Sequence, residues 1–224
     1  MIIWQEIKSV FLDMDGTLLD LNFDNHFWQD FVPLRYAEQH GMGLAEAKEV
    51  LVPQFRAMEG RLEWYCLDYW SEALQLDIVA MKQELAGLIS MLPHVEDFLD
   101  TVRASGRRMV LVTNAHPRSL ELKLERTSLR MFFDSIVSSH TLQLPKEHPD
   151  FWQRLRQQES YQPQSTLMVD DSLPVLKAAR SFGIAHTVAV NPADSMQRQL
   201  ALAAGFPCIA DFRELSTLPG LVQP

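Results

Sequence analysis

Short apolar runs recur along the chain, and each ends in polar residues followed by a turn or helix-start signal. Four are clear, at residues 9–13, 108–114, 165–171 and 186–191, and a weaker one covers 133–139. Such short runs, separated by helical stretches, are typical of strands buried on both faces of a parallel sheet. The pattern therefore predicts a parallel sheet of four or five strands.

The segments between these runs have helical periodicity. One apolar stripe ends before Gly106 and another ends before Gly183, a residue suited to terminate a helix. The stripes comprise Val95, Phe98, Leu99 and Val102, and then Val175, Leu176, Ala178, Ala179 and Phe182. Alternating strands and helices predict an α/β fold with a doubly wound, mostly parallel, Rossmann-like sheet.

One interval breaks this alternation. Between Asp20 and Pro93 the apolar spacing is helical throughout, and Pro33 is expected to kink or split a first helix that begins near His26. Three further stripes are Leu44, Ala47, Leu51, Phe55 and Met58; Leu62, Tyr65, Cys66, Tyr69 and Ala73; and Ile78, Met81, Leu85, Leu88 and Ile89. We therefore expect a core formed by residues 1–19 and 94–224, with an all-helical cap, residues 20–93, inserted after the first strand.

Composition narrows the classes of partner. The 224 residues carry a formal net charge of −9, which disfavours nucleic acid and anionic membranes as partners. No signal peptide or membrane-length apolar run is visible, and Cys66 and Cys208 have no paired spacing. We expect a cytoplasmic protein with two structural thiols, while the sequence does not indicate its oligomeric state.

Polar residues gather where the predicted strands end. In an open parallel sheet, ligands bind beyond the carboxyl ends of the strands. The residues expected there are Asp13, Asp15, Thr113, Asn114, Asp170 and Asp171, together with Lys146 from a loop. Taken singly, the first two could form an ordinary turn and the lysine could be solvated, but together these groups predict a phosphoryl-transfer site.

The residue types suit that chemistry. One carboxylate can attack phosphorus, while a second protonates the leaving oxygen and then activates water. Hydroxyl, amide and ammonium groups can hold phosphoryl oxygens, and Mg²⁺ would screen the carboxylates from the phosphate. Gly16 would allow a tight turn after the first strand, and Thr17 is expected to hydrogen-bond back into that loop.

The stretches "DMDGTL", "VTN", "PKE" and "VDDS", in this order, resemble the four motifs of the haloacid dehalogenase superfamily. The resemblance implies that Asp13 is the nucleophile and Asp15 the general acid/base, and that both bind Mg²⁺, Asp15 through its backbone carbonyl. It implies that Thr113 and Lys146 hold the phosphoryl group and that Thr17 and Asn114 also bind the phosphate. It further implies that Asp170 binds Mg²⁺ directly and that Asp171 orients a metal-bound water or the lysine.

Longer stretches resemble the bacterial GMP/IMP nucleotidases of this superfamily: "LLDLNFDNHFWQ", "EWYCLDYWSEALQLDI", "VTNAHPRSLELKLE" and "SSHTLQLPKE". The resemblance implies a purine nucleoside monophosphate as substrate. Most aromatic residues of the cap should be core, although one of them, such as Trp64, could stack on a base. The polar candidates for base or ribose contacts are Asn25, His26, Arg61 and His116.

Other functions remain open at this level. A phosphatase or phosphomutase acting on a sugar phosphate would need the same motifs, whereas a phospho-acceptor signalling domain would place its acidic residues in the reverse order. Asp15 argues against a dehalogenase. A phosphonatase needs a cap lysine, and Lys48 and Lys82 are both expected to face solvent. An inactive binding module ranks last, since all motif residues are present.

Residues 18–23 and 90–95 are expected to connect cap and core and to permit gating.

Overall fold

A six-stranded parallel sheet forms the centre of the protein. The computed structural model describes residues 2–196 and 205–216. The strands are β1 (Ser9–Leu12), β2 (Arg108–Thr113), β3 (Ser135–Ser138), β4 (Thr166–Asp170), β5 (His186–Val190) and β6 (Cys208–Ile209). Their order is β3-β2-β1-β4-β5-β6, and every neighbouring pair is parallel. The predicted α/β class is confirmed; β6, only two residues long, was not predicted.

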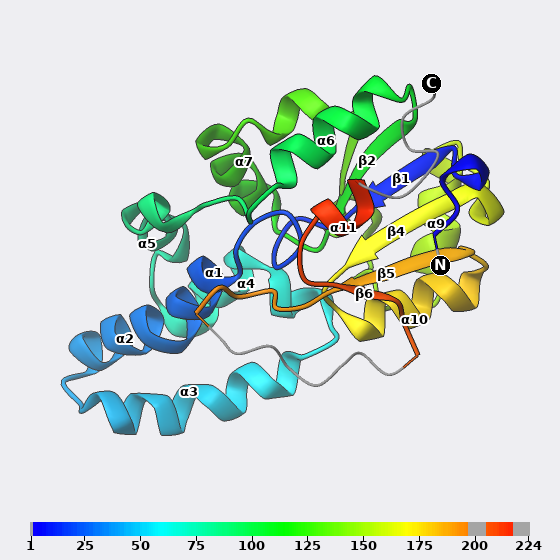
Figure 1. The fold of residues 1–224 in the computed structure, drawn as a ribbon. Coiled ribbons are helices and arrows are strands. Elements are labelled where there is room, and N and C mark those ends of the chain that lie inside the picture. The colour runs from blue at the N-terminus through cyan, green and yellow to red at the C-terminus, as the bar shows by residue number, and fades with distance from the viewer. Residues whose placement is uncertain (1, 197–204, 217–224) are drawn as a thin grey trace.

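Helices cover both faces of this sheet (Figure 1). Alternate residues of β1 point to opposite sides, so Val10 and Leu12 enter one buried cluster and Phe11 the other. The first cluster includes residues of α6 (Val95–Ala104), α7 (Pro117–Arg126), η5 (Leu129–Phe132) and α11 (Arg213–Ser216). The second includes residues of α9 (Phe151–Gln158) and α10 (Leu173–Phe182). The sheet is therefore buried on both faces, as the continuous apolar runs predict.

The stripe-based helices in the core are confirmed. Val95, Phe98 and Leu99 are fully buried on α6. The helix α10 ends at Gly183, whose φ of 112° requires a residue without a side chain to avoid strain. The helix α10 follows β4 directly, whereas α6 leads from the insert back into the sheet at β2.

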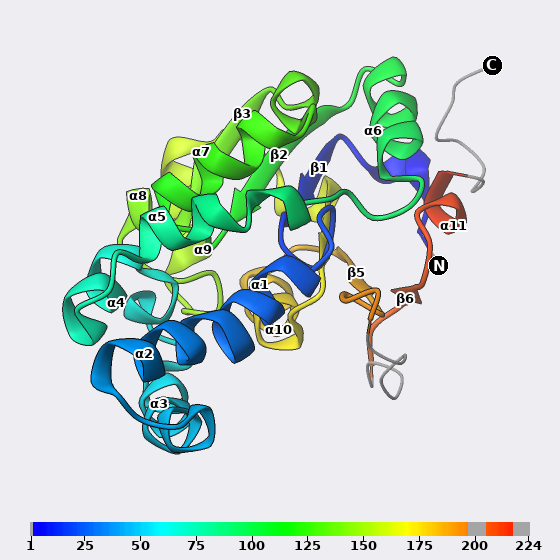
Figure 2. The same cartoon turned by 90° about the vertical axis from the view of Figure 1, so that its left-hand side faces the viewer.

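Helices joined by short turns also form the segment between Asn22 and Leu88, which lies between β1 and α6. They are α1 (Asn22–His26), a π-helical turn η2 (Phe27–Phe31), α2 (Val32–His40), α3 (Leu44–Met58), η3 (Leu62–Tyr65), α4 (Leu67–Leu74), α5 (Ile78–Glu84) and η4 (Ala86–Leu88). They share a buried cluster of their own, which includes Phe27, Leu51 and Trp70. In Figures 1 and 2 helices α1–α4 lie beyond the strand ends. This helical insert supports the expected cap.

The first helix of the insert differs from the prediction. It begins at Asn22 rather than near His26, and Pro33 does not split it. The π-helical turn immediately precedes α2, and Pro33 occupies the first turn of α2. A proline in that position costs little, because the wider turn has already altered the local hydrogen-bond pattern.

The two connections between insert and core lie side by side. Leu19 and Met91 form an antiparallel bridge. The Leu92 N–H donates to Leu18 O at 2.9 Å, and the Asp20 N–H donates to Ser90 O at 3.0 Å. This pairing places the entry to the insert beside its exit, as a hinge between the two parts would require. Within the described residues, no helix combines the length and apolar character needed to cross a membrane.

Candidate active site

The loop after β1 makes a tight turn at the carboxyl edge of the sheet. The N–H groups of Leu18 and Leu19 both donate to Met14 O, at 2.9 and 2.8 Å. Gly16 has a φ of +82°, and a Cβ atom there would lie 2.5 Å from Asp171 Oδ2. The glycine is therefore needed for the turn, as predicted, and also for the close approach of Asp171 to the loop.

Thr17 corrects one expectation about this loop. Its side chain is fully buried, and its Oγ1 has no hydrogen-bond partner among the described residues. The predicted bond back into the loop is therefore wrong. The backbone bonds at Gly16, Leu18 and Leu19 already close the turn, so the hydroxyl has no acceptor within it. Thr17 also lies outside the lining of the pocket described below.

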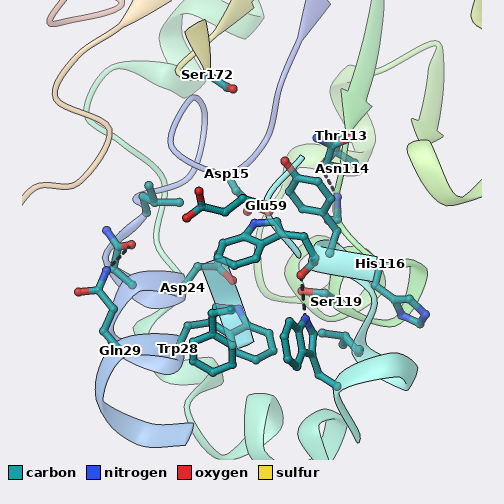
Figure 3. A pocket seen from close by; sticks show the side chains of 18 of the residues that line it. Asp15, Asp24, Trp28, Gln29, Glu59, Thr113, Asn114, His116, Ser119 and Ser172 are labelled. Carbon is teal, nitrogen blue, oxygen red and sulfur yellow. Dashed lines mark hydrogen bonds between the residues drawn. The ribbon is translucent and has the colours of Figure 1, made fainter. Parts of the chain in front are cut away.

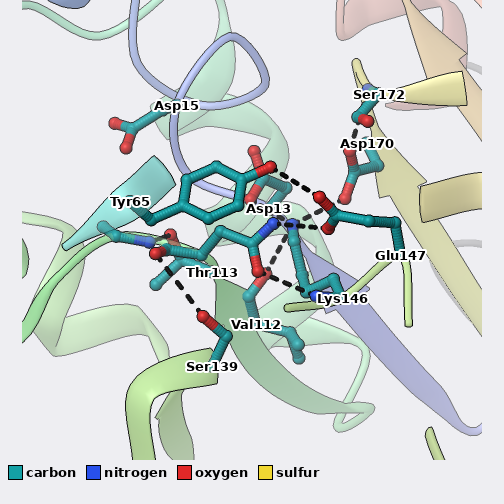
Figure 4. A network of polar contacts seen from close by, with 12 residues as sticks. Asp13, Asp15, Tyr65, Val112, Thr113, Ser139, Lys146, Glu147, Asp170 and Ser172 are labelled. Carbon is teal, nitrogen blue, oxygen red and sulfur yellow. Dashed lines mark hydrogen bonds and ion pairs between the residues drawn. The ribbon is translucent and has the colours of Figure 1, made fainter. Parts of the chain in front are cut away.

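Lys146 links the ends of three strands (Figure 4). Its Nζ donates to Asp13 Oδ1, to Asp170 Oδ2 at 2.7 Å and to Val112 O at 3.1 Å. Burial raises the pKa of Asp13 to about 6, although Lys146 acts in the opposite direction. The paired carboxylates raise the pKa of Lys146 despite its burial. Above pH 6 the pair is therefore an ammonium beside a carboxylate, the ionised form that a carboxylate nucleophile requires.

Three carboxylates converge next to this lysine. Asp13, Asp170 and Asp171 each offer an oxygen, and these oxygens lie within 4.8 Å of one another. Burial, followed by the charges of Asp170 and Asp13, raises the pKa of Asp171 well above its usual range. One lysine cannot neutralise three carboxylates, two of which are buried, and an all-oxygen donor set suits a hard divalent cation. The predicted metal residues therefore fit a divalent metal ion.

Thr113 and Asn114 end β2 beside the carboxylates. Thr113 is buried, and its Oγ1 accepts a hydrogen bond from the Ala115 N–H at 3.0 Å. Asn114 Oδ1 accepts from the Lys146 N–H at 2.9 Å, while its Nδ2 donates to Glu147 Oε2 at 3.0 Å. Asn114 therefore holds the loop that carries Lys146, in addition to lining the pocket.

Glu147 joins this network to the helical insert. Tyr65, on η3, donates from its hydroxyl to Glu147 Oε1 at 2.9 Å (Figure 4). Burial and the adjacent Glu147 carboxylate raise the pKa of Tyr65, which therefore stays protonated and able to donate. The contact joins insert and core directly above the strand ends.

Asp15 is paired with a lysine that sequence reasoning missed. Lys123 Nζ donates to Asp15 Oδ1 and to Asp24 Oδ2, both at 2.6 Å. Asp24 Oδ1 in turn accepts from Lys82 Nζ at 2.7 Å. Asp15 lies in the loop after β1, Lys123 on α7, and Asp24 and Lys82 in the insert. The four charges thus form one chain from the expected acid/base to the insert.

The charges in this chain shift one another's protonation. Burial raises the pKa of Asp15 to about 6, with Lys123 opposing the shift. Desolvation also acts on Asp24, but Lys123 and Lys82 together lower its pKa, so it stays ionised. A carboxyl with a pKa of about 6 can release and accept a proton near neutral pH, which suits an acid/base group.

The expectation that Lys82 faces solvent is wrong. The side chain is 3% exposed, pairs with Asp24, and lies 4.8 and 4.6 Å from the ring centroids of Phe23 and Phe27. Lys48, in contrast, is 39% exposed and pairs with Asp30. A signal for the missed lysines was present: Lys82 continues the stripe of Ile78 and Leu85, as Lys123 continues that of Leu120 and Leu124. A lysine in an apolar stripe needs a buried carboxylate partner.

A cavity of about 690 Å³ extends from the carboxylates into the insert (Figure 3). Its far walls are aromatic: Trp28, Phe55, Trp64 and Trp70 line it. Trp28 packs edge-on against Phe55 with ring centroids 5.6 Å apart, and the Trp70 indole N–H donates to Trp64 O at 3.0 Å. Aromatic walls held rigid in this way suit a flat apolar ring as ligand.

Polar groups are interspersed among these rings. Asn25 and Gln29 line the cavity, and Gln29 Nε2 donates to Asn25 Oδ1 at 3.1 Å. Asn25 Nδ2 itself donates to Asp194 Oδ2 at 2.6 Å, which ties the residue to the core. His116 also lines the cavity. These groups can give a ligand orientation that the rings alone cannot.

The cavity includes some predicted substrate contacts and not others. Asn25, Trp64 and His116 line it, as do Asp13, Asp15 and the other carboxyl-end residues except Thr17. His26 and Arg61 do not. Their side chains are 44% and 59% exposed and pair with Asp30 and Glu63 on the surface of the insert. Both were inferred from polarity alone, which does not distinguish the inside of a cavity from the outer surface.

The sheet order, the carboxylates at the strand ends and the helical insert define a class of protein that comparison also identifies. The chain belongs to the haloacid dehalogenase-like hydrolases, whose pattern matches residues 7–183. It is 40% identical over 221 residues to the GMP/IMP nucleotidase YrfG of Escherichia coli, covering 99% of this chain and 98% of that protein. It is 29% identical to a phosphoglycolate phosphatase of Pseudomonas putida, covering 97% and 80% of the two chains. A crystal structure of a HAD phosphatase from Thermococcus onnurineus superimposes with a TM-score of 0.76 at 23% identity, over 93% and 96%.

Proposed function

We propose that the protein is a Mg²⁺-dependent 5′-nucleotidase that hydrolyses purine mononucleotides, GMP and IMP, to nucleoside and phosphate. One observation carries the proposal. The buried Asp13–Lys146 pair and the Asp15 carboxyl open directly into a cavity whose far walls are aromatic. A phosphate ester with a planar base would fill both ends. The 40% identity to a GMP/IMP nucleotidase along almost the whole chain supports the same substrate.

The proposed reaction has two steps. Asp13 attacks phosphorus, a bond forms between its carboxylate oxygen and phosphorus, and the ester P–O bond breaks. Asp15 gives its proton to the departing nucleoside oxygen. Water then attacks the aspartyl phosphate, Asp15 takes the water proton, and inorganic phosphate leaves with Asp13 restored. The raised pKa of Asp15 supports both proton transfers near neutrality.

The remaining motif residues would hold the phosphoryl group. Lys146 supplies an ammonium to the transferring oxygens, and Thr113 and Asn114 supply hydroxyl and amide groups. The Thr17 hydroxyl has no partner among the described residues, but its side chain is enclosed. Its predicted contact with the phosphate would require the loop to rearrange. Mg²⁺, held by Asp13, the backbone of Asp15 and Asp170, with Asp171 nearby, would neutralise charge on the phosphate.

We also propose separate roles for the two parts of the chain. Residues 1–19 and 94–224 would be the catalytic core, and residues 20–93 the cap that selects the substrate. The positions 197–204 and 217–224 lie outside the described residues. In the cap, Trp64 would stack on the purine, while Asn25 of the cap and His116 of the core contact its polar edge or the ribose. The paired connections at Leu19 and Met91 would let the cap open for substrate and close to exclude water.

A second substrate class has some support. The similarity to a phosphoglycolate phosphatase points to small phosphate esters, on which the same core residues would act. The large aromatic cavity favours the nucleotide, because a small polar ester would leave most of it unfilled. A phosphonatase would need an enclosed lysine in the cap, and the buried Lys82 meets that condition. The Lys82 amine is already paired with Asp24, however, and is not free to react with a substrate.

Phosphate release from a panel of esters tests the proposal. The panel contains nucleoside monophosphates, phosphoglycolate, sugar phosphates, phosphonoacetaldehyde and p-nitrophenyl phosphate, each with Mg²⁺ and with EDTA. We expect metal-dependent release, highest with GMP and IMP and abolished in Asp13→Asn. Preference for phosphoglycolate or a sugar phosphate would keep the chemistry and reject the purine assignment. No release from any ester, with a lasting phosphoaspartate, would favour a signalling domain.

A further inference from the structure

A second group of metal-ligating side chains lies where the insert meets the core. Cys66 Sγ and one ring nitrogen each from His116 and His140 lie within 4.8 Å of one another. Cys66 precedes α4 in the insert, His116 precedes α7, and His140 lies in α8 (Ser139–Leu142), which follows β3. None of the three belongs to the carboxylate cluster. The chain thus brings a soft donor and two imidazoles together from three separate segments.

The hydrogen bonds around this cluster leave donor atoms available to a cation. His140 Nε2 is buried and has no hydrogen-bond partner among the described residues. His116 Nδ1 accepts only a long bond, 3.3 Å, from the Arg118 N–H, so its electron pair is weakly engaged. Its Nε2 lies 3.5 Å from Asp68 Oδ2, which makes Nε2 the protonated nitrogen and leaves Nδ1 as the nitrogen that a metal could bind. Cys66 Sγ accepts only a long bond, 3.5 Å, from the Tyr69 N–H.

Both imidazoles are favoured in the neutral form that binds metals. Burial, followed by the neighbouring His116, lowers the pKa of His140 to about 4. Burial also lowers the pKa of His116, although Asp68 opposes the shift. The two rings lie 4.9 Å apart at an interplanar angle of 79°. Each neutral ring therefore offers one unprotonated nitrogen to a metal.

We propose that Cys66, His116 and His140, with solvent as the remaining ligand, form a site for a borderline-soft divalent cation such as Zn²⁺ that fastens the insert to the core. Sulfur and imidazole ligands select Zn²⁺ over Mg²⁺, which prefers oxygen. Zn–S and Zn–N bonds of about 2.3 and 2.0 Å place ligand atoms roughly 3.5 Å apart. Side-chain rotations that bring the present donors closer by about an ångström would close the site. On binding, the Cys66 thiol loses its proton to solvent as the metal–sulfur bond forms.

Fastening has a functional consequence. Cys66 belongs to the insert and the two histidines belong to the core, so a bound cation resists their separation. Substrate entry and product release past the insert would then slow. The site would therefore act as an inhibitory metal site, separate from the metal at Asp13 and Asp170. This consequence rests on the proposed function, whereas metal binding itself does not.

Cobalt binding tests the site without any need for turnover. Co²⁺ is added to the protein in excess Mg²⁺ and reducing agent, and the near-ultraviolet thiolate-to-cobalt band and the visible bands are recorded. We expect a one-to-one complex with a thiolate band and tetrahedral visible bands, displaced by Zn²⁺. Cys66→Ser should remove the thiolate band, and His140→Ala should weaken affinity at least tenfold. Cys208→Ser, the other free cysteine, is the matched control and should bind as the wild type does.

Several results would overturn the site. No thiolate band in the wild type, or the same band in Cys66→Ser, would exclude Cys66 as a ligand. Unchanged affinity in His140→Ala would exclude the imidazole. Circular dichroism of each variant shows whether it is folded, and His140→Gln is used if His140→Ala is not.

Inhibition tests the consequence. Zn²⁺ at the concentration that saturates the site, with excess Mg²⁺, should lower phosphate release several-fold in the wild type and in Cys208→Ser but not in Cys66→Ser. Equal inhibition of all three would assign the effect to the carboxylate site and reject fastening. Should no ester be hydrolysed, the proposed function fails while the cobalt result still decides whether the site exists.

Discussion

The two ends of the cavity are built on different principles. At the sheet end, buried charges alternate in sign, with Lys146 between Asp13 and Asp170 and Lys123 between Asp15 and Asp24. At the insert end, aromatic rings pack on one another and polar groups stand between them. Charges fixed at the strand ends suit one reaction on any phosphate ester. The aromatic wall discriminates between the organic groups that are attached to the phosphate. Reaction and substrate choice should therefore respond to separate substitutions.

Asp13→Asn should have the largest effect. Removing the attacking oxygen should lower kcat by roughly 10³-fold or more with every ester, because the covalent step is lost. Initial rates with GMP and with p-nitrophenyl phosphate measure it, and circular dichroism checks folding. Comparable activity in the variant would mean that another group attacks phosphorus.

Lys123→Met should have the next largest effect. It leaves Asp15 and Asp24, which are partly buried, with one cation fewer, and breaking a buried pair costs about 3–5 kcal/mol of stability at most. The variant should melt lower, and the pKa of Asp15 should rise, so the pH profile of kcat/KM should move to higher pH with both substrates.

Two further variants distinguish a role of Lys123 in positioning Asp15 from a role in stability alone. Lys123→Arg should restore the wild-type pH profile, and Lys177→Met, on the exposed face of α10, should change neither melting nor profile. A pH profile unchanged in Lys123→Met would show that the lysine supports only the fold.

Trp64→Ala should affect only one class of substrate. Base–aromatic stacking is worth about 1–3 kcal/mol, so kcat/KM for GMP should fall roughly 5- to 150-fold. The p-nitrophenyl ester should lose much less, because its chemistry depends on the sheet end. The contact between Trp70 and the backbone of residue 64 survives the change. Equal losses with both esters would contradict the separation of the two ends.

Asp171→Asn should have the smallest effect, which is a change in thermal stability. Burial and neighbouring carboxylates raise the pKa of Asp171, Asp13 and Asp15, so the folded state retains protons that the unfolded chain releases. Without metal, stability should therefore fall as pH rises from about 4 to above 6. The variant should melt a few degrees higher than the wild type in EDTA at pH 8 and gain less from Mg²⁺, measured by calorimetry. A lower melting temperature would mean that the carboxylate is compensated within the protein.

The sheet end was largely predictable from sequence, and the insert end was not. Parallel strands bring their carboxyl ends to one edge, so the positions of Asp13, Thr113 and Asp170 follow from the order of short apolar runs. The pairing of Lys123 with Asp15 spans 108 residues, and it depends on how α7 packs beside the insert. Only the apolar neighbours of that lysine indicated burial.

The insert was harder for a physical reason. Its helices repeat the same apolar spacing, and that spacing shows which residues are buried without showing which helices face one another. His26 and Asn25 are adjacent and similarly polar, yet one faces solvent and the other lines the cavity. Periodicity also did not indicate the π-helical turn that joins α1 to α2, in whose first turn Pro33 lies.

Acid-quenched turnover of GMP, followed by mass spectrometry of the peptide that contains Asp13, tests the central claim most directly. The account predicts a transient phosphoryl group on Asp13 that forms only with Mg²⁺, decays as inorganic phosphate appears, and is absent from Asp13→Asn. Release of phosphate with no label on the protein, or with the label on another residue, would contradict it.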